Sequence, residues 1–191
     1  MSTLVIVLRL VSLLVFVGPM VLAATGRCGG PKTRARQRGS DRAPLVANLA
    51  AVGVYLPSLL AFSGNPGGST ALLLASAGSL LAVVGVGLVV RSRAELGPAW
   101  SFVPKADQGT GLVTTGPYLL VRHPIYLGLA LLVMGEALAF GSWPALMIVL
   151  FGIVPTFAWR ARAEETLLSR TFGERYAVYR QRTKMIIPYL L

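Results

Sequence analysis

The feature that most constrains this chain is an apolar run at residues 124–159, in which Glu136 is the only charged side chain. This run is longer than the roughly 20 apolar residues that cross a bilayer as one helix. The turn-forming residues Gly141-Ser-Trp-Pro144 divide it near its middle. Each arm has about 15 residues and rises about 1.5 Å per residue, so it spans about 23 Å. We therefore expect a short helical hairpin whose two ends lie at the same membrane face.

The composition agrees with a membrane protein and excludes an ordinary soluble domain. Of the 191 residues, 54% are hydrophobic and only 13% are charged, whereas soluble domains have roughly 25% charged residues. The 18 Lys and Arg give a net charge of +11, but they lie in blocks beside apolar runs, as expected of a chain that faces anionic membrane lipids and binds no nucleic acid. With one cysteine and one histidine, the chain lacks a Cys/His set for a metal ion, and no metal is expected.

Three further apolar segments precede the hairpin, and the charges between them set the orientation. We expect membrane helices at residues 3–24, 44–62 and 69–90, with Arg9 snorkelling from the end of the first. Residues 27–42 contain six Lys or Arg and one Asp, which places this loop at the cytoplasmic face and the amino terminus outside. A signal peptide is the alternative for the first segment. Its basic block follows the apolar run instead of preceding it, so we expect the helix to be retained.

The sequence therefore predicts a single all-α membrane domain over residues 1–191, with five membrane helices and a cytoplasmic helical tail. Residues 1–91 supply the first three helices, in which small residues allow close helix contacts at Gly78, Gly85 and Gly87. Residues 94–122 contain too many Gly and Pro for a helix, and loops of this length are usually functional. Frequent Ala, Gly and Arg favour a bacterial inner membrane. The sequence gives no indication of oligomeric state.

Polar side chains gather at both ends of the predicted hairpin. Arg122 and His123 precede the first arm, and Arg160, Glu164 and Glu165 follow the second. The spacing of four places Arg160 and Glu164 on one helix face. Taken singly, each residue has a simpler interpretation: arginines anchor helix ends at the head groups, a surface ion pair contributes a few tenths of a kcal/mol, and the nearby tyrosines form an interfacial belt. Their combination favours a functional site.

Two motifs carry a family resemblance. The first is GPYLLVRHPIYLG at residues 116–128. The second begins at Arg160 and continues with Glu164, Glu165, Leu168, Phe172, Gly173, Tyr176, Tyr179 and, near the end of the chain, Ile187 and Pro188. Gly173 is also expected to end the helix that leaves the membrane. Together the motifs resemble the isoprenylcysteine carboxyl methyltransferase family, which belongs to a wider group with the phospholipid N-methyltransferases. The resemblance covers roughly residues 94–190.

The resemblance implies an enzyme whose catalytic part, residues 92–191, binds S-adenosyl-L-methionine at the cytoplasmic face. His123 is expected to donate to the carboxylate of this cofactor, and Glu164 or Glu165 to hold its ammonium. Arg160 and Glu164 are the expected catalytic residues, with Arg160 orienting an anionic acceptor or organising the glutamates. The other expected cofactor contacts are the loop amides near Leu112, Val113, Gly116 and Tyr118 and the rings of Tyr126 and Tyr176. An intramembrane acid such as Glu136 is a functional hypothesis by default, but we do not place it in this site.

The sequence leaves three chemical classes of methyl acceptor open. A lipophilic acceptor that enters from the membrane is expected. An ionised prenylcysteine carboxylate is already nucleophilic, whereas the amine of phosphatidylethanolamine must first lose a proton, and a small thiol is a third choice. Prenylated protein tails are not expected in bacteria, which conflicts with the carboxylate. The alternatives outside this class are a membrane scaffold or lipid-binding sensor, and a transporter, which ordinarily has paired broken helices at the membrane midplane.

Overall fold

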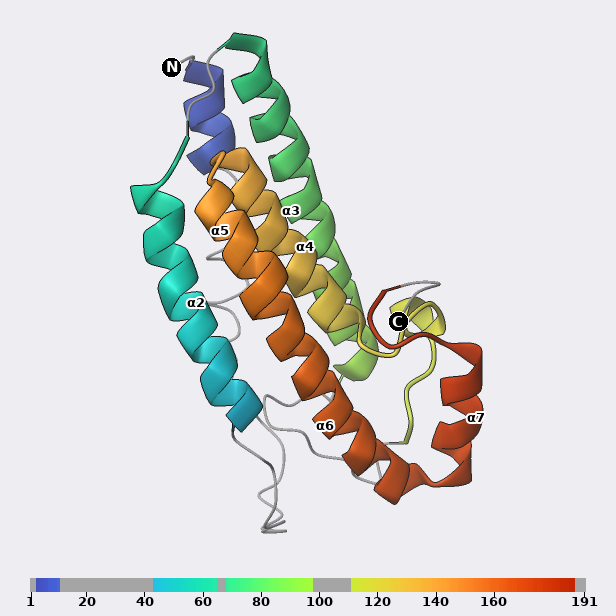
Figure 1. Cartoon of the computed structure of the whole chain (residues 1–191). Coiled ribbons are helices and arrows are strands. Elements are labelled where there is room, and N and C mark those ends of the chain that lie inside the picture. Colours follow the sequence, from blue (N-terminus) through green and yellow to red (C-terminus); the bar gives the residue numbers. More distant parts are fainter. Residues whose placement is uncertain (1–2, 11–42, 65–67, 98–110, 188–191) are drawn as a thin grey trace.

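The computed structural model describes residues 3–10, 43–64, 68–97 and 111–187, and these residues form a bundle of helices without strands (Figure 1). The all-helical fold predicted from the sequence is therefore confirmed for the described ranges. A helix at residues 3–10 precedes the labelled elements. These are α2 (Ala43–Ala61), α3 (Gly68–Leu96), the 3-10 helix η2 (Gly116–Leu119), α4 (Pro124–Ala139), α5 (Trp143–Ile148), the π-helical turn η3 (Val149–Ile153), α6 (Val154–Phe172) and α7 (Glu174–Arg182).

Two of the described helices are long and apolar enough to cross a membrane, judged by length and composition: Gly68–Leu96 and the continuous helix Trp143–Phe172. Two shorter apolar helices, Val46–Ala61 and Pro124–Ala139, accompany them. The first predicted span is described as a helix only at residues 3–10, and the rest of it lies outside the described residues. The number of five membrane helices therefore stays a prediction.

The carboxyl-terminal end of α3 differs from the sequence prediction. We expected this helix to end at residue 90, but it continues to Leu96, and Gly97 follows with a φ of +50°. The residues in between, RSRAEL, contain good helix formers. The first arginines therefore mark the end of the apolar stretch and not the end of the helix. The prediction of an irregular segment at residues 94–122 is confirmed at 111–115 and 120–122, whereas 94–96 belong to α3 and 116–119 form the short 3-10 helix η2. Residues 98–110 lie outside the described residues.

The predicted hairpin is present, and its turn forms where Gly141 and Ser142 were expected to break the apolar run. Gly141 has a φ of +61°, and the Ser142 side chain caps α5 by accepting from the backbone N–H of Ala145 at 3.4 Å. As predicted, the second arm continues out to Phe172 and ends at Gly173. The π-helical turn η3 was not predicted. It precedes Pro155, whose ring cannot accept a regular α-helical turn before it and which has no N–H to donate.

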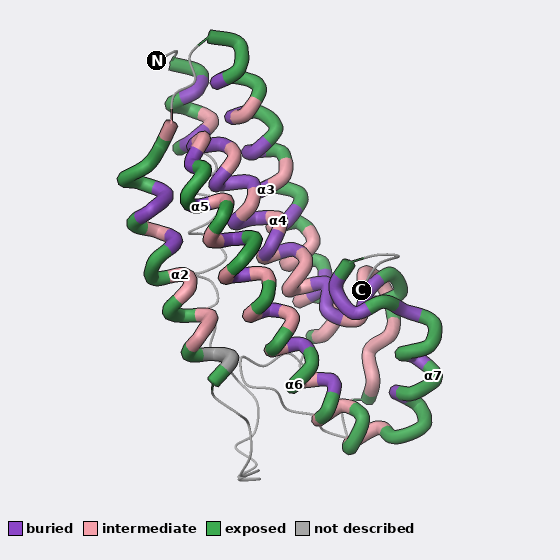
Figure 2. Tube along the Cα trace, in the orientation of Figure 1, coloured by how far each residue is buried: buried purple, intermediate pink, exposed green. Residues whose placement is uncertain are grey.

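The second arm and α2 cover one side of α4 and α3 covers another, and α4 is the most buried of the described helices (Figure 2). On one side, Tyr55 of α2 is fully buried and donates its hydroxyl to the carbonyl of Val133 at 2.8 Å. Apolar side chains from α2, α4 and the second arm surround it, including Leu59, Phe140, Val149, Ile153 and Phe157. This cluster fixes the second arm against α4 and thereby fixes the position of the polar residues that follow it.

On its other side α4 touches the backbone of α3 through glycines spaced seven residues apart. Gly85 lies against Gly128, so that a Cβ added at Gly85 would be 2.5 Å from the carbonyl oxygen of Gly128. Gly135 likewise lies against Gly78, with 2.5 Å between an added Cβ and the Gly78 carbonyl oxygen. The predicted close approach is confirmed for Gly78 and Gly85. It is wrong for Gly87, which is exposed and has nothing within 4 Å of its Cβ position.

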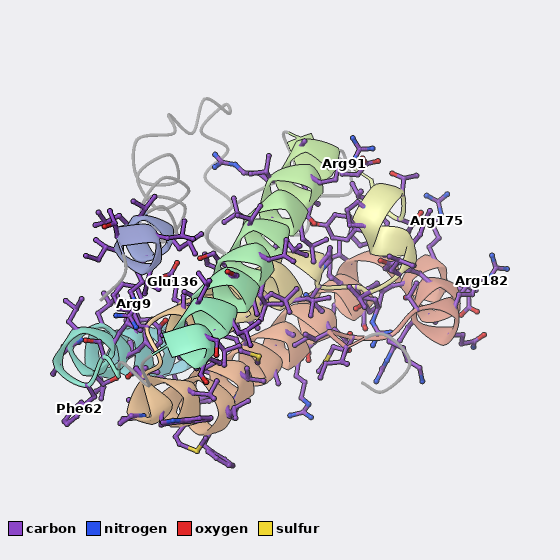
Figure 3. The ribbon with its side chains drawn as sticks, turned by 90° about the horizontal axis from the view of Figure 1, so that it is seen from above. Arg9, Phe62, Arg91, Glu136, Arg175 and Arg182 are labelled. Carbon is purple, nitrogen blue, oxygen red and sulfur yellow. The ribbon has the colours of Figure 1, made fainter. Side chains whose placement is uncertain are left out.

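Arg9 does not snorkel to the head groups, contrary to the sequence prediction. It is 8% exposed and donates inward, to the carbonyls of Ala139 at 2.9 Å and Gly64 at 2.8 Å, with its guanidinium 5.4 Å from the Phe140 ring centroid. The carbonyls at the end of α4 have no partner in the next turn of helix, so a cation there is favourable. Arg9 thus pins the amino-terminal helix to the hairpin turn. In Figure 3, Arg9 and Glu136 lie at the end of the bundle away from Arg175 and Arg182.

The glycine contact between α3 and α4 predicts an unequal response to alanine. We expect Gly85→Ala to lower the free energy of unfolding by about 1–3 kcal/mol, because the new methyl group would meet backbone atoms that cannot rotate away. Gly87→Ala on the same helix is the matched control, and we expect it to be neutral or slightly stabilising. Thermal unfolding in detergent measures both. Equal midpoints for the two variants would contradict the close contact.

Candidate functional site

Three segments that are distant in the sequence meet where α4 begins. The backbone N–H of Arg122 donates to the carbonyl of Lys184 at 2.8 Å, and that of His123 donates to the carbonyl of Met185 at 2.9 Å. Val121 and Lys184 form the single parallel bridge found in the described part of the chain. The chain that follows α7 therefore lies along the residues that precede α4. Its buried Met185 and Ile186 pack with Ala161, so that α6 is the third segment at this meeting point.

His123 lies between the two glutamates that follow the hairpin. Its Nδ1 is 3.6 Å from Glu164 Oε2, and its Nε2 is 3.7 Å from Glu165 Oε1. The imidazole is 7% exposed, so these carboxylates are its polar surroundings. The prediction that the hairpin brings the residues at its two ends together is confirmed.

Glu164 is held on one side by aromatic and cationic groups. The hydroxyl of Tyr126 donates to Glu164 Oε1, and Arg160 Nε lies 3.4 Å from the same oxygen. The Tyr126 ring stacks between His123 and Phe157, with centroid distances of 5.6 and 5.5 Å. The Arg160 guanidinium carbon is 5.8 Å from the centroid of the Tyr126 ring. Because the Glu164 side chain is still 20% exposed, the carboxylate is oriented and also accessible to a ligand.

Glu165 has a different environment. Its Oε1 forms an ion pair of 2.6 Å with Arg122 Nε, and the two side chains are only 9% and 8% exposed. Arg122 also donates through Nη1 to the carbonyl of Arg180 at 3.2 Å and to that of Thr183. The arginine thus joins α6 to the end of α7 and does not anchor at a head group, the simpler interpretation that we gave it from the sequence. The Glu165 carboxylate is occupied by its ion pair with Arg122. The Glu164 carboxylate is more accessible to a ligand.

A tyrosine cluster forms the next wall, from Tyr118, Tyr176 and Tyr179, with Leu112 and Val113 packed against it. Tyr179 donates its hydroxyl to the carbonyl of Tyr118 at 2.7 Å, which joins α7 to η2. Burial raises the pKa of Tyr179 to about 12 although the charge of Arg122 opposes the rise. Burial likewise raises the pKa of Tyr176, so both rings stay neutral. These tyrosines are buried and do not form the interfacial belt that was the simpler interpretation.

Two buried polar atoms of the site lack a hydrogen bond, although one of them, His123 Nε2, lies 3.7 Å from Glu165 Oε1. Among the described residues, His123 Nε2 and the Tyr176 hydroxyl are buried and form no hydrogen bond. Because such groups cost free energy when unsatisfied, this position is suited to water or to a ligand with polar groups. A groove of about 410 Å³ opens between α6 and α7 and is lined partly by Tyr176 and Arg180. It borders the cluster but does not include His123 or Glu164. The acids, the imidazole and the aromatic walls together fit a cofactor with an ammonium, a carboxylate and an adenine.

A family model described as phospholipid methyltransferase matches residues 73–175 of this chain, which is more than half of it. The matched segment includes His123, Arg160, Glu164 and Glu165. The chain belongs to this family. The resemblance inferred from the two motifs is thereby confirmed at the level of the wider group.

Similar proteins agree with this assignment. The Schizosaccharomyces pombe protein-S-isoprenylcysteine O-methyltransferase is 29% identical over 116 residues, covering 59% of this chain and 49% of that protein. The nickel-cobalt-cadmium resistance protein NccN of Alcaligenes xylosoxydans xylosoxydans is 31% identical over 110 residues, covering 57% of this chain and 51% of that protein. The chain thus spans about half the length of these curated relatives. A solved structure of the eukaryotic intramembrane Ras methyltransferase, an isoprenylcysteine carboxyl methyltransferase, has a TM-score of 0.59 at 18% identity, covering 94% of this chain and 68% of that one. It shows the fold.

The Arg122 junction predicts that this arginine stabilises the site. We expect Arg122→Gln to lower the free energy of unfolding by about 3–5 kcal/mol, because it leaves the buried Glu165 carboxylate uncompensated. The control is Arg180→Gln, since the Arg180 side chain is 61% exposed and 3.9 Å from the same carboxylate; we expect a change within about 0.5 kcal/mol. Chemical unfolding in detergent measures both. The double variant Arg122→Gln/Glu165→Gln should recover part of the loss, and a stable Arg122→Gln single variant would disprove the junction.

Proposed function

We propose that the chain is a membrane methyltransferase that uses S-adenosyl-L-methionine and acts on a lipophilic acceptor, as an isoprenylcysteine carboxyl O-methyltransferase does. The observation that carries the proposal is the contact of His123 with Glu164 and Glu165, which places a hydrogen-bond donor and acids together at one end of the hairpin. Family membership and the name of the Schizosaccharomyces pombe relative support the same reaction class. A membrane scaffold would not require this arrangement of buried polar residues.

Each group of the cofactor has a counterpart in the site. His123 Nε2 would donate to the cofactor's carboxylate, and Glu164 would accept from its ammonium. We now assign Glu165 to holding Arg122, since that ion pair occupies the carboxylate. The remaining proposed contacts are the loop at Leu112, Val113, Gly116 and Tyr118 and the rings of Tyr126 and Tyr176. When bound, the cofactor supplies an electrophilic methyl group on a sulfonium, and an aromatic ring face attracts such a cation.

Positioning accounts for the chemistry proposed for these residues. Methyl transfer is a displacement in which the acceptor atom approaches in line, so holding the reactants in this geometry supplies much of the rate without an acid or a base. Arg160 lies beside Glu164 and over Tyr126, where its charge can orient an anionic acceptor. His123 is enclosed by carboxylates and is not placed to remove a proton from an acceptor. We therefore favour a carboxylate acceptor.

The second candidate acceptor is the amine of a phospholipid, which the description of the matched family favours. A small thiol is the third. The site residues lie in or next to apolar helices, which supports an acceptor that enters from the lipid phase. The basic residues that follow them, such as Arg91 and Arg160, support a cytoplasmic site with the amino terminus outside. We place the protein in a bacterial inner membrane on the composition of the chain.

Cofactor binding provides the first test of the proposed function. We expect the detergent-purified protein to bind S-adenosylmethionine, and His123→Ala and Glu164→Ala to weaken binding by about tenfold or more, as for lost hydrogen bonds to charged groups. Titration calorimetry measures the dissociation constants. Glu174→Ala, which removes an exposed acid at the start of α7, is the control and should bind as the wild type does. The absence of binding by the wild type would refute the enzyme assignment, and unchanged affinity in both site variants would refute the site.

The identity of the acceptor has its own test. Labelled cofactor is supplied with a prenylcysteine, phosphatidylethanolamine or a small thiol, and we expect the highest kcat/KM with the prenylcysteine. Its product is a methyl ester that mild base hydrolyses to labelled methanol, which neither an N-methyl nor an S-methyl product releases. We expect Arg160→Gln to lower turnover of the carboxylate by about a hundredfold, since it removes a charge that orients the acceptor. A base-stable product from the lipid amine would replace the carboxylate with the second candidate.

A further inference from the structure

Glu95 is a carboxylate at the edge of the site that the proposed function does not yet use. It lies near the cytoplasmic end of α3, in the turn that extends beyond the apolar stretch. Its Oε1 accepts a hydrogen bond from the hydroxyl of Thr115, which directly precedes η2. Glu95 is half-buried and this hydrogen bond is exposed, so a ligand can reach the carboxylate. The longer α3 therefore carries an acid into the loop that we assign to the cofactor.

The backbone of Gly116 lies against this carboxylate and leaves no space for a side chain. A Cβ added at Gly116 would lie 2.9 Å from Glu95 Oε2 and 3.0 Å from its Cδ, and the residue has a φ of +58°, which favours glycine. The loop backbone thus lies directly on the acid, while Thr115 fixes the other oxygen. Glu95 is held in one orientation by two neighbouring residues of the same loop, which is more constraint than an ordinary solvated surface acid has.

Tyr118 belongs both to η2 and to the tyrosine wall of the site. Its side chain is buried, and burial raises its pKa, followed by smaller contributions from Tyr179, Glu164 and Glu95. The ring is therefore within electrostatic reach of one acid from α6 and another from α3. Of the two carboxylates, Glu95 lies directly beside η2, against which α3 packs, and Glu164 influences Tyr118 of η2 through its charge. A ligand that contacts the η2 loop and Glu164 can extend along this wall to Glu95.

S-adenosylmethionine has the groups that such an arrangement would recognise. In the proposed function, its amino-acid end lies at His123 and Glu164. Its ribose carries two adjacent hydroxyls, and nucleotide-binding proteins commonly hold ribose hydroxyls with a carboxylate acceptor. We propose that Glu95 accepts hydrogen bonds from the ribose hydroxyls of the cofactor, with Thr115 and Gly116 orienting its carboxylate. This inference rests on the proposed function because it requires the same cofactor.

A cycle that changes both the protein and the ligand tests the contact. The full chain in detergent is titrated with S-adenosylhomocysteine and with its 2′-deoxy and 3′-deoxy analogues. We expect Glu95→Ala to weaken binding of the parent compound by about tenfold, the usual loss for a hydrogen bond to a charged group. We expect the same variant to change the affinity of at least one deoxy analogue by less than about twofold, because the hydroxyl that the acid would accept from is already absent. The control Glu174→Ala should leave the affinities for all three compounds unchanged.

Each outcome has a distinct meaning. If the wild type binds none of the ligands, the proposed function fails and this inference fails with it. If the wild type binds but Glu95→Ala weakens all three ligands equally, or none of them, the proposed function stands and the ribose contact is refuted. Gly116→Ala provides the same test should Glu95→Ala fold poorly, since its methyl group would displace the carboxylate that it meets at 2.9 Å. We expect it to show the same selective loss for the parent compound.

Discussion

The contact between the backbones of α3 and α4 is the constraint on which the rest of this structure depends. Gly78 and Gly85 face Gly135 and Gly128, and there is no space between them for even a methyl group. In a membrane, where burial of apolar surface does not drive helices together, such close packing supplies the attraction. It fixes α4 relative to α3 over its length. The end of α3 and the η2 residues that precede α4 are thereby placed beside each other.

Two adjacent acids have separate duties in the site because of helix geometry. Neighbouring residues on an α-helix point about 100° apart, since a turn contains about 3.6 residues. Glu165 therefore faces Arg122 and the end of α7, whereas Glu164 faces Tyr126 and Arg160. His123 touches both and connects the two surfaces. Of the two adjacent glutamates, Glu165 thus stabilises the structure and Glu164 is the candidate ligand-binding group.

The sequence was sufficient to predict the features that depend on composition and on turn-forming or helix-ending residues. It predicted the hairpin, its turn at Gly141, the helix end at Gly173 and the meeting of His123 with Glu164 and Glu165. It did not predict the pairing of Arg122 and His123 with Lys184 and Met185, because hydrogen bonds between backbones leave no side-chain signal. The inward direction of Arg9 was missed because hydropathy does not distinguish a lipid-facing arginine from one that binds the carbonyls of a helix end. Adjacent identical acids could not be separated without their partners.

The pairing of Lys184 with Val121 also has a consequence for the order in which the protein is synthesised. Lys184 and Met185 follow all the described apolar helices in the chain, so they leave the ribosome after those helices have been synthesised. The groups around His123 can reach their final arrangement only once those residues arrive. The described apolar helices are therefore synthesised before the backbone pairing at Arg122 and His123 can form.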